Sequence, residues 1–167
     1  MLVRRIQPED APRLQAFVRA LSPGARRERF FAPVQELTAA QLRRMTLNPG
    51  LTLGAFDRHG AVTGLAEYSA AAPGEAEFAL VVSDAWQRRG LGEQLLWTLI
   101  EHARARGFLR MTGITRESNQ AMRALARRAG FVTRRDGDPA FVRLERSLIH
   151  DGNKPFLERN SAITSAA

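Results

Sequence analysis

One stretch of the chain, residues 77–131, constrains the fold more than any other. It opens with Phe78-Ala-Leu-Val-Val82, an apolar run short enough and β-branched enough to predict a buried strand. A basic loop with two glycines follows, Gln87-Arg-Arg-Gly-Leu-Gly92. Apolar residues then recur at helical spacing up to a glycine that predicts the helix end: Leu91, Leu95, Leu99, Ala103 and Gly107.

This order of strand, loop and helix favours an anion site at the start of the helix. Free backbone N–H groups and the positive end of the helix dipole meet there. Gly90 and Gly92 lack a Cβ, so a phosphate can approach the backbone closely. Arg88 and Arg89 can add charge-assisted contacts. A pyrophosphate suits such a site. An ordinary helix start with solvated arginines has the same residues, however, so the loop alone does not show whether the protein binds a phosphate.

The surrounding sequence excludes two common kinds of nucleotide-binding site. No Gly-Lys-Ser/Thr follows, so this is not a nucleotide triphosphate loop, and the G-x-G-x-x-G spacing of a dinucleotide site is absent. Downstream, residues 108–115 predict another strand, Asn119 begins a short helix, and Gly130-Phe131 ends it and starts a further strand.

With these residues the chain resembles the GNAT superfamily of acyl-CoA-dependent N-acetyltransferases. Gln87-Arg-Arg-Gly-Leu-Gly92 matches that family's Q/R-x-x-G-x-G/A pyrophosphate loop, and Asn119, Leu125 and Gly130-Phe131 match its downstream pattern. The resemblance covers residues 2–147. It implies an α/β fold in which helices flank a mixed, mostly antiparallel central sheet, with acetyl-CoA as cosubstrate and coenzyme A as product.

The resemblance also implies which residues hold acetyl-CoA. Two strands splay apart beside the glycine loop, and the pantetheine arm lies in the gap. The implied cofactor-binding residues are Leu80, Val81 and Val82 through their backbone, the loop residues Gln87, Arg88, Arg89, Gly90, Leu91 and Gly92, and Asn119 and Arg123. Asn119 is equally suited to cap its helix, and Arg123 is equally suited to a solvated helix face.

Acyl transfer to an amine requires a base, because a lysine ammonium with a pKa of about 10.4 is not a nucleophile. Glu77 is the candidate, since in the lysine acetyltransferases a glutamate at the matching place in a Glu-Phe-Ala-Val/Leu-Val-Val run plays that role. Alternatively Glu77 only pairs with a neighbouring arginine, and Glu75 and Glu67 are then the remaining carboxylates.

The sequence departs from the family at the general acid. Many members have a tyrosine seven residues after the helix asparagine, and this chain has Ala126 there. Its only tyrosine, Tyr68, lies on the preceding hairpin and is no obvious replacement. Either water protonates the leaving thiolate or the chemistry is weak.

The N-terminal part of the chain predicts a strand and three helices, which are expected to form the binding site for the acceptor amine. Residues 2–6 predict a strand and residues 8–20 a helix; Ser22 caps a second helix to about Phe31, and Thr38 caps a third that ends before Asn48. In the superfamily this region lines the acceptor site. Here Leu21-Ser22, Arg29-Phe30-Phe31, Leu37 and Leu42-Arg-Arg-Met-Thr46 resemble the bacterial protein lysine acetyltransferases. A protein lysine is therefore the expected acceptor. The alternatives are a small amine, a protein N-terminus, or a non-catalytic acyl-CoA-binding module.

Two hairpins and a tail complete the predicted organisation. Residues 51–56 pair with 61–69 through Asp57-Arg-His-Gly60, and a loop spans residues 70–74. A closing hairpin joins residues 131–135 to 140–146 through Asp136-Gly-Asp-Pro139. We expect one domain over residues 1–148 and a flexible C-terminal tail over residues 149–167.

Bulk composition limits the partners. The net charge of +8 is carried almost entirely by arginine, because Lys154 is the only lysine. Basic chains can bind nucleic acid, but the arginines are scattered, so we favour a general preference for arginine and expect no nucleic-acid partner. The chain has no cysteine and no apolar run long enough for a membrane span. We expect a cytoplasmic monomer or homodimer without a metal site.

Overall fold

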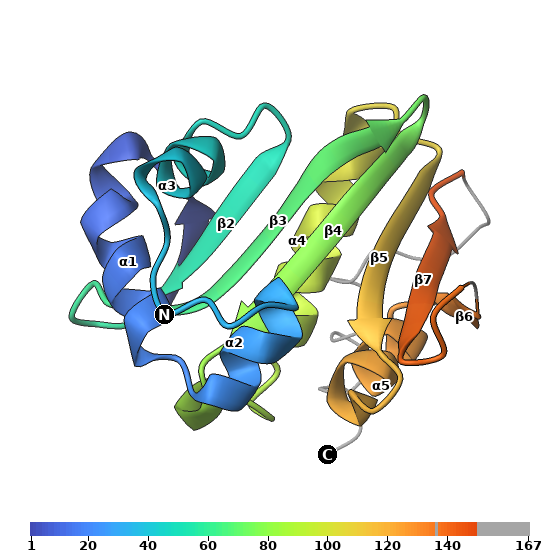
Figure 1. The fold of residues 1–167 in the computed structure, drawn as a ribbon. Coiled ribbons are helices and arrows are strands. Elements are labelled where there is room, and N and C mark those ends of the chain that lie inside the picture. The colour runs from blue at the N-terminus through green and yellow to red at the C-terminus, as the bar shows by residue number, and fades with distance from the viewer. Residues whose placement is uncertain (136, 150–167) are drawn as a thin grey trace, which may run out of the picture.

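The computed structural model describes residues 1–135 and 137–149. Within them one sheet has the strand order β1-β2-β3-β4-β5-β7-β6, and helices cover both of its faces (Figure 1). The strands are β1 (Leu2–Arg5), β2 (Leu51–Phe56), β3 (Val62–Ala72), β4 (Glu75–Val82), β5 (Arg110–Arg116), β6 (Val132–Arg134) and β7 (Phe141–Ser147). The helices are α1 (Ala11–Ala20), α2 (Pro23–Phe30), α3 (Ala39–Thr46), α4 (Leu91–Ala105) and α5 (Gln120–Arg128), with 3₁₀ turns η1 (Pro8–Asp10) and η2 (Asp84–Trp86).

Three helices begin at the capping residues that the sequence predicts. The Ser22 hydroxyl accepts a hydrogen bond from the Ala25 N–H, and the Asn119 side chain accepts one from the Met122 N–H. Thr38 forms a reciprocal capping box with Gln41 at the start of α3. The predicted first helix divides, because Pro8–Asp10 is a 3₁₀ turn and the α-helix begins only at Ala11.

The predicted hairpin of β2 and β3 is confirmed, but the loop expected over residues 70–74 is wrong. β3 continues to Ala72, and only Pro73 and Gly74 turn the chain into β4. A bulge between Ala70 and Ala72 keeps the ladder in register with β4. Gly74 adopts a φ of 73°, which glycine reaches without the steric cost of a side chain.

One pairing in the sheet is parallel, and it is short. β4 pairs with β5 only from Glu75 to Glu77, opposite Arg110 to Thr112. The other neighbouring strands are antiparallel, which confirms a mixed, mostly antiparallel sheet. Beyond Glu77, β4 stays paired with β3 as far as Val82, and β5 stays paired with β7 as far as Arg116. The two strands therefore separate, as the resemblance implies.

Each face of the sheet has its own core. Tyr68, Phe78 and Leu80 pack with the buried side of α4, whose predicted apolar face is confirmed. On the other face, Leu65 and Val81 pack with buried residues of α1 and α3. β6 pairs with β7 as predicted, although residue 136 of their turn is outside the described residues. The predicted tail also lies outside them, from residue 150 onward.

Candidate active site

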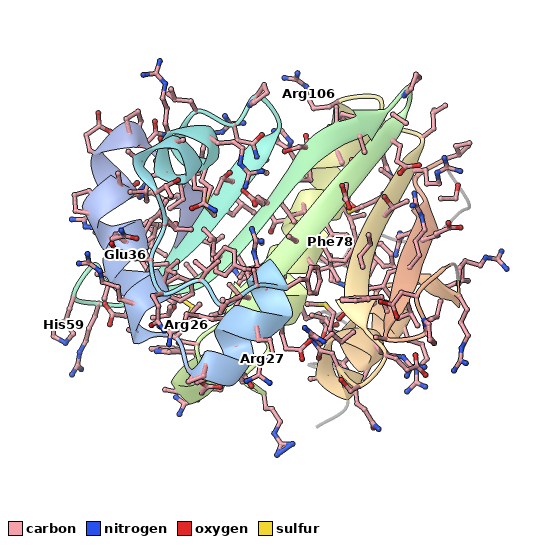
Figure 2. The ribbon with its side chains drawn as sticks, in the orientation of Figure 1. Arg26, Arg27, Glu36, His59, Phe78 and Arg106 are labelled. Carbon is pink, nitrogen blue, oxygen red and sulfur yellow. The ribbon has the colours of Figure 1, made fainter. Side chains whose placement is uncertain are left out.

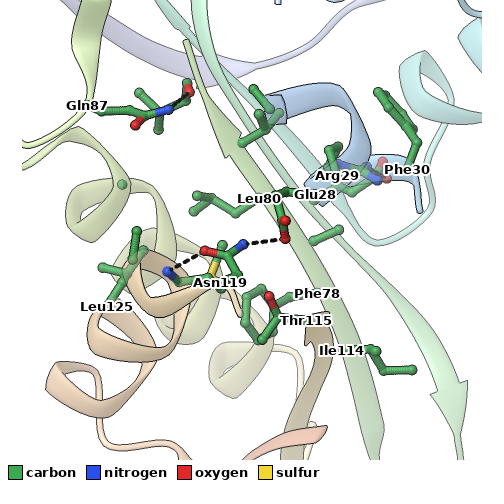
Figure 3. Close-up of a pocket in the computed structure, with 18 of the residues that line it drawn as sticks. Glu28, Arg29, Phe30, Phe78, Leu80, Gln87, Ile114, Thr115, Asn119 and Leu125 are labelled. Carbon is green, nitrogen blue, oxygen red and sulfur yellow. Dashed lines mark hydrogen bonds and ion pairs between the residues drawn. The ribbon is translucent and has the colours of Figure 1, made fainter. Parts of the chain in front are cut away.

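A cleft of about 1390 Å³ lies along β4 where this strand parts from β5 (Figure 3). Its walls come from α2, α3, β3, β4, the start of α4, the end of β5, α5 and β7. Because these elements are far apart in the sequence, the fold as a whole creates the site. Of the predicted site residues, the cleft is lined by Glu77, Leu80, Val81, Val82, Gln87, Arg88, Gly90, Gly92 and Asn119.

Beyond Glu77, the edge of β4 that faces β5 has no paired strand among the described residues. The side chains of Leu80 and Val82 are buried in the α4 core, so they present mainly backbone to the cleft. Backbone N–H and C=O groups at an unpaired edge can bind an extended chain as an added strand would. The Val82 carbonyl, however, already accepts a hydrogen bond of 3.0 Å from Gln87 Nε2. The Gln87 side chain thus holds the loop onto the end of β4.

The glycine loop forms an anion cradle. Gly90 is the N-cap of α4 with a φ of 81°, and no side chain caps this helix. Arg88 also has a positive φ, 58°, and such left-handed residues turn successive N–H groups into a concave anion site. A Cβ at Gly90 would meet nothing within 4 Å, whereas one at Gly92 would lie 3.3 Å from Leu125 Cδ2. Among the described residues the space beside Gly90 is open, which leaves room for an anion such as a pyrophosphate.

Three of the predicted cofactor residues do not line the cleft. Leu91 is buried in the core, and the Arg89 guanidinium lies 5.5 Å from the centre of the Trp86 ring. Arg123 is directed toward Glu117, donating 3.0 Å to its carbonyl and lying 3.2 Å from its carboxylate. The Arg123 side chain is 35% exposed and is bound to Glu117, so its contact with the cofactor stays a prediction.

Arg128 lines the cleft in place of Arg123. It lies seven residues after Ala121, another lining residue, so the two share one face of α5. Arg123 is two residues from Ala121 and points elsewhere. Spacing from Asn119 favours Arg123, which is four residues on, so the sequence analysis did not select Arg128. Its Nε lies 3.7 Å from the Glu93 carboxylate in the first turn of α4.

Asn119 has both a capping role and a place on the cleft. Its Oδ1 accepts from the Met122 N–H at 3.0 Å, which confirms the N-cap. Its Nδ2 donates to Glu28 Oε2 at 2.9 Å, and both bonds are drawn in Figure 3. The amide has a second N–H that could serve a ligand. The sequence analysis did not identify Glu28, and no local pattern connects it to a residue 91 positions away.

The three candidate carboxylates have different surroundings. Glu77 is exposed, lines the cleft, and forms no ion pair or side-chain hydrogen bond with the described residues. It lies opposite Ser69 in the β3–β4 ladder. Glu67, by contrast, forms an ion pair with Arg29 in which both side chains are almost buried. The alternative in which Glu77 only pairs with an arginine does not hold within the described residues.

Glu75 is buried, and both of its carboxylate oxygens accept hydrogen bonds. It accepts hydrogen bonds from Thr112 at 3.0 Å, from Arg110 at 2.9 Å and from Arg143 at 2.7 Å. Burial alone would raise the pKa of Glu75, but these hydrogen bonds and the charges of the two arginines outweigh it and lower the pKa. A carboxylate stabilised in this way is a weak base. Its bonds instead join β4, β5 and β7 just before β4 and β5 separate.

No tyrosine lines the cleft in the part of the chain that the structure describes. Ala126 is buried in the core. Tyr68 is fully buried on the α4 side of the sheet, where its hydroxyl lies 2.7 Å from His102 Nδ1. This confirms that Tyr68 does not replace the family's general acid. His102 itself is half-buried.

Comparison with known proteins agrees with this geometry. The family model "Acetyltransferase (GNAT) family" matches residues 15–131. An acetyltransferase of Pseudomonas aeruginosa is 32% identical over 145 residues, covering 83% of this chain and 78% of the relative. An L-methionine sulfoximine/L-methionine sulfone acetyltransferase of the same species is 40% identical over 84 residues. This match spans about half of each protein, 47% of this chain and 49% of the relative.

Solved structures share the fold. The GNAT domain of S. lividans PAT superposes with a TM-score of 0.81 at 31% identity, covering 87% of this chain and 89% of that one. A phosphinothricin acetyltransferase from Sinorhizobium meliloti, in complex with AcCoA, gives 0.74 at 21% identity, with 92% of each chain covered.

The cleft, the glycine loop and the splayed strands define an acyl-CoA-dependent acyltransferase, and the chain belongs to the acetyltransferase (GNAT) family. Its cosubstrate is acetyl-CoA. Catalysis is therefore favoured over a non-catalytic acyl-CoA-binding module. Among the described residues no helix is long and apolar enough to cross a membrane, and no cluster of His, Asp and Glu could hold a metal ion.

Proposed function

We propose that this acetyltransferase transfers the acetyl group of acetyl-CoA to the side-chain amine of a protein lysine, with Glu77 as the general base. The observation that carries the proposal is the contrast among the three carboxylates. Glu67 and Glu75 are bound to arginines, whereas Glu77 has no ion-pair partner among the described residues and lines the cleft where β4 leaves β5. A free carboxylate at that place can accept a proton from an approaching ammonium, directly or through one water.

Acetyl-CoA supplies the activated acyl group as a thioester. The first-turn N–H groups of α4 would hold the pyrophosphate, with Arg88 and Arg128 adding positive charge at the cleft. The unpaired edge of β4 at Leu80 to Val82 and the second amide N–H of Asn119 would position the pantetheine arm. With Ala126 buried, the proton for the leaving thiol comes from water in this proposal.

Two observations support a protein lysine as acceptor. The segment from Leu21 to Thr46 resembles the lysine acetyltransferases, and it forms α2 and α3, which contribute lining residues to the cleft. The chain is also similar over most of its length to the GNAT domain of S. lividans PAT. A cytoplasmic monomer or homodimer remains our prediction for the protein, and the absence of cysteine is compatible with a reducing compartment.

A small amine is the second candidate acceptor. It is favoured by the similarity of half the chain to an L-methionine sulfoximine/L-methionine sulfone acetyltransferase. The two acceptor classes differ in size, because a protein lysine needs open space outside the cleft for the rest of its polypeptide and a small amine does not. A protein N-terminus would require the same room as a protein lysine.

The test is release of coenzyme A thiol by the wild-type enzyme with acetyl-CoA and a panel of acceptors. The panel contains lysine peptides, peptides with a free N-terminus and blocked lysines, methionine sulfoximine and simple polyamines. The proposal predicts the highest kcat/KM with lysine peptides and a mass increase of one acetyl group on the lysine. Turnover confined to free amino acids or polyamines would contradict it.

A further inference from the structure

A second, smaller pocket of about 290 Å³ lies beside the cleft. It is formed by one side of α2, the segment that follows α2, and Arg116 at the end of β5. Phe31, Ala32 and Val34 line both this side pocket and the cleft. The side pocket is therefore adjacent to the candidate active site, and an acceptor whose lysine enters the cleft would pass its flanking residues over it.

Phe31 separates the two hollows in an unusual backbone conformation. It ends α2 with a φ of 54° and a ψ of 15°, in the left-handed region where helices commonly place glycine. For a bulky residue this conformation is uncommon, and such outliers concentrate at functional sites. Phe31 is 40% exposed as a residue, and its ring packs edge-on against Phe141, with ring centres 5.3 Å apart. The strained backbone thus holds an aromatic ring at the rim of the cleft.

The charge of the side pocket is one-sided. Of the described residues, its lining includes Arg26, Arg27 and Arg116 and no carboxylate. Arg26 and Arg27 project from α2 (Figure 2) and form no ion pair among the described residues. The nearest partner of Arg116 is Glu28, whose carboxylate is 4.0 Å away, too far for a hydrogen bond. An arginine cluster next to an exposed aromatic ring is suited to acidic peptide recognition.

We infer that the side pocket binds an acidic side chain near the acetylated lysine of a protein acceptor, with Phe31 packing against the intervening peptide. This inference rests on the proposed function, because it needs the lysine in the cleft. It deepens that function by naming the acceptor class, which is a lysine flanked by aspartate or glutamate. Arg27 is the key residue, since Arg26 also donates to the Arg19 carbonyl and Arg116 also lies over Phe141.

The experiment compares acetylation of three peptides that share one lysine and differ in its flanks, which carry glutamates, glutamines or arginines. Each is assayed with wild type, with Arg27→Glu and with the charge-matched control Arg58→Glu. Arg58 is next to His59, in the β2–β3 turn away from α2 (Figure 2). We expect wild type to prefer the glutamate peptide, and Arg27→Glu to lower its kcat/KM for that peptide roughly fivefold to tenfold, mostly through KM. The glutamine peptide and the Arg58→Glu enzyme should change little.

A binding assay keeps this inference separate from the proposed function. Fluorescence anisotropy of the labelled glutamate peptide is measured with wild type and Arg27→Glu, both checked by thermal unfolding. If no peptide is acetylated but the glutamate peptide binds through Arg27, the lysine proposal fails and the side pocket stands. If lysine peptides are acetylated equally whatever their flanks, the side-pocket inference is overturned. Binding of a DNA oligonucleotide that depends on Arg27, without any peptide preference, would also overturn it.

Discussion

Asn119 and Glu28 are 91 residues apart in the chain, yet Asn119 Nδ2 donates a 2.9 Å hydrogen bond to Glu28 Oε2. This bond joins the start of α5 to α2, and both residues line the cleft. The same amide caps α5 through its Oδ1. One side chain therefore stabilises a helix and links the cofactor side of the site to the acceptor side.

Substitution of Asn119 can separate these two roles. Serine keeps a capping oxygen and removes the amide donors, whereas alanine removes both. We expect Asn119→Ala to lower the free energy of unfolding by about 1 kcal/mol more than Asn119→Ser does. Acetyl-CoA affinity, measured by calorimetry, should fall in both variants by a similar factor. Equal stabilities in urea unfolding would show that the cap contributes nothing, and unchanged affinities would remove Asn119 from the cofactor site.

The start of the chain contains a pH-sensitive ion pair. Asp10 is buried and accepts two hydrogen bonds from Arg4, at 2.6 and 2.8 Å, besides bonds from the Gln7 N–H and from Arg13. Mainly because of the Arg4 hydrogen bonds, the pKa of Asp10 is well below its ordinary value. A lowered pKa in the folded state means that the pair stabilises the fold above the unfolded aspartate pKa of 3.8 and loses this contribution as the pH falls below it.

We therefore expect Asp10→Asn to cost about 1–3 kcal/mol of unfolding free energy at pH 7, because hydrogen bonds to a charged group are lost. The difference from wild type should shrink progressively below about pH 4. Urea unfolding at several pH values measures it. If the difference in unfolding free energy between wild type and Asp10→Asn stays constant down to pH 3, the charge of the Asp10 carboxylate is not what stabilises the N-terminal segment.

Glu75 should matter for stability and not for proton transfer. Glu75→Gln keeps the size of the side chain but removes the charge that Arg110 and Arg143 bind. We expect a loss of about 1–3 kcal/mol in unfolding free energy, with kcat at a permissive temperature within about threefold of wild type, since general-base removal typically costs far more. A loss of several hundredfold in kcat with the fold intact would make Glu75, and not Glu77, the base.

Gly90 is predicted to be required for its backbone conformation. Its φ of 81° is costly for most side chains, although a Cβ would meet no atom within 4 Å. Gly90→Ala should therefore destabilise the protein by about 1–2 kcal/mol, and Gly90→Asn by less, because asparagine adopts the left-handed region more readily. Thermal unfolding ranks the three proteins. Equal destabilisation by alanine and asparagine would contradict a conformational cause.

Local sequence signals were enough for most of the fold. Ser22, Thr38 and Asn119 each combine a capping side chain with a following helical pattern, so the starts of α2, α3 and α5 were predictable. The end of β3 was not. The small residues Ala70 to Ala72 resemble a loop, and only their pairing with β4 across the bulge makes them a strand.

The site was predictable where it depends on contiguous residues. The glycine loop and the β4 edge are each one short segment, and both line the cleft. Long-range partners were not predictable from local patterns. The ion pair of Glu67 with Arg29, the bonds of Glu75 and the bond of Asn119 to Glu28 all join separate elements. These contacts are what distinguish Glu77 from the other carboxylates.

The most direct test of this account is the rate of acetyl transfer by Glu77→Gln, with Glu9→Gln as a control that removes the same charge from an exposed residue outside the cleft. Both are measured at saturating acetyl-CoA with the best acceptor of the panel, and cofactor affinity is measured separately. If Glu77 is the general base, its variant should bind acetyl-CoA as wild type does and lose roughly 10²–10⁴ in kcat, while the control keeps its rate. A Glu77→Gln enzyme within about threefold of wild type would contradict the account, since the loss expected for a general base is far larger.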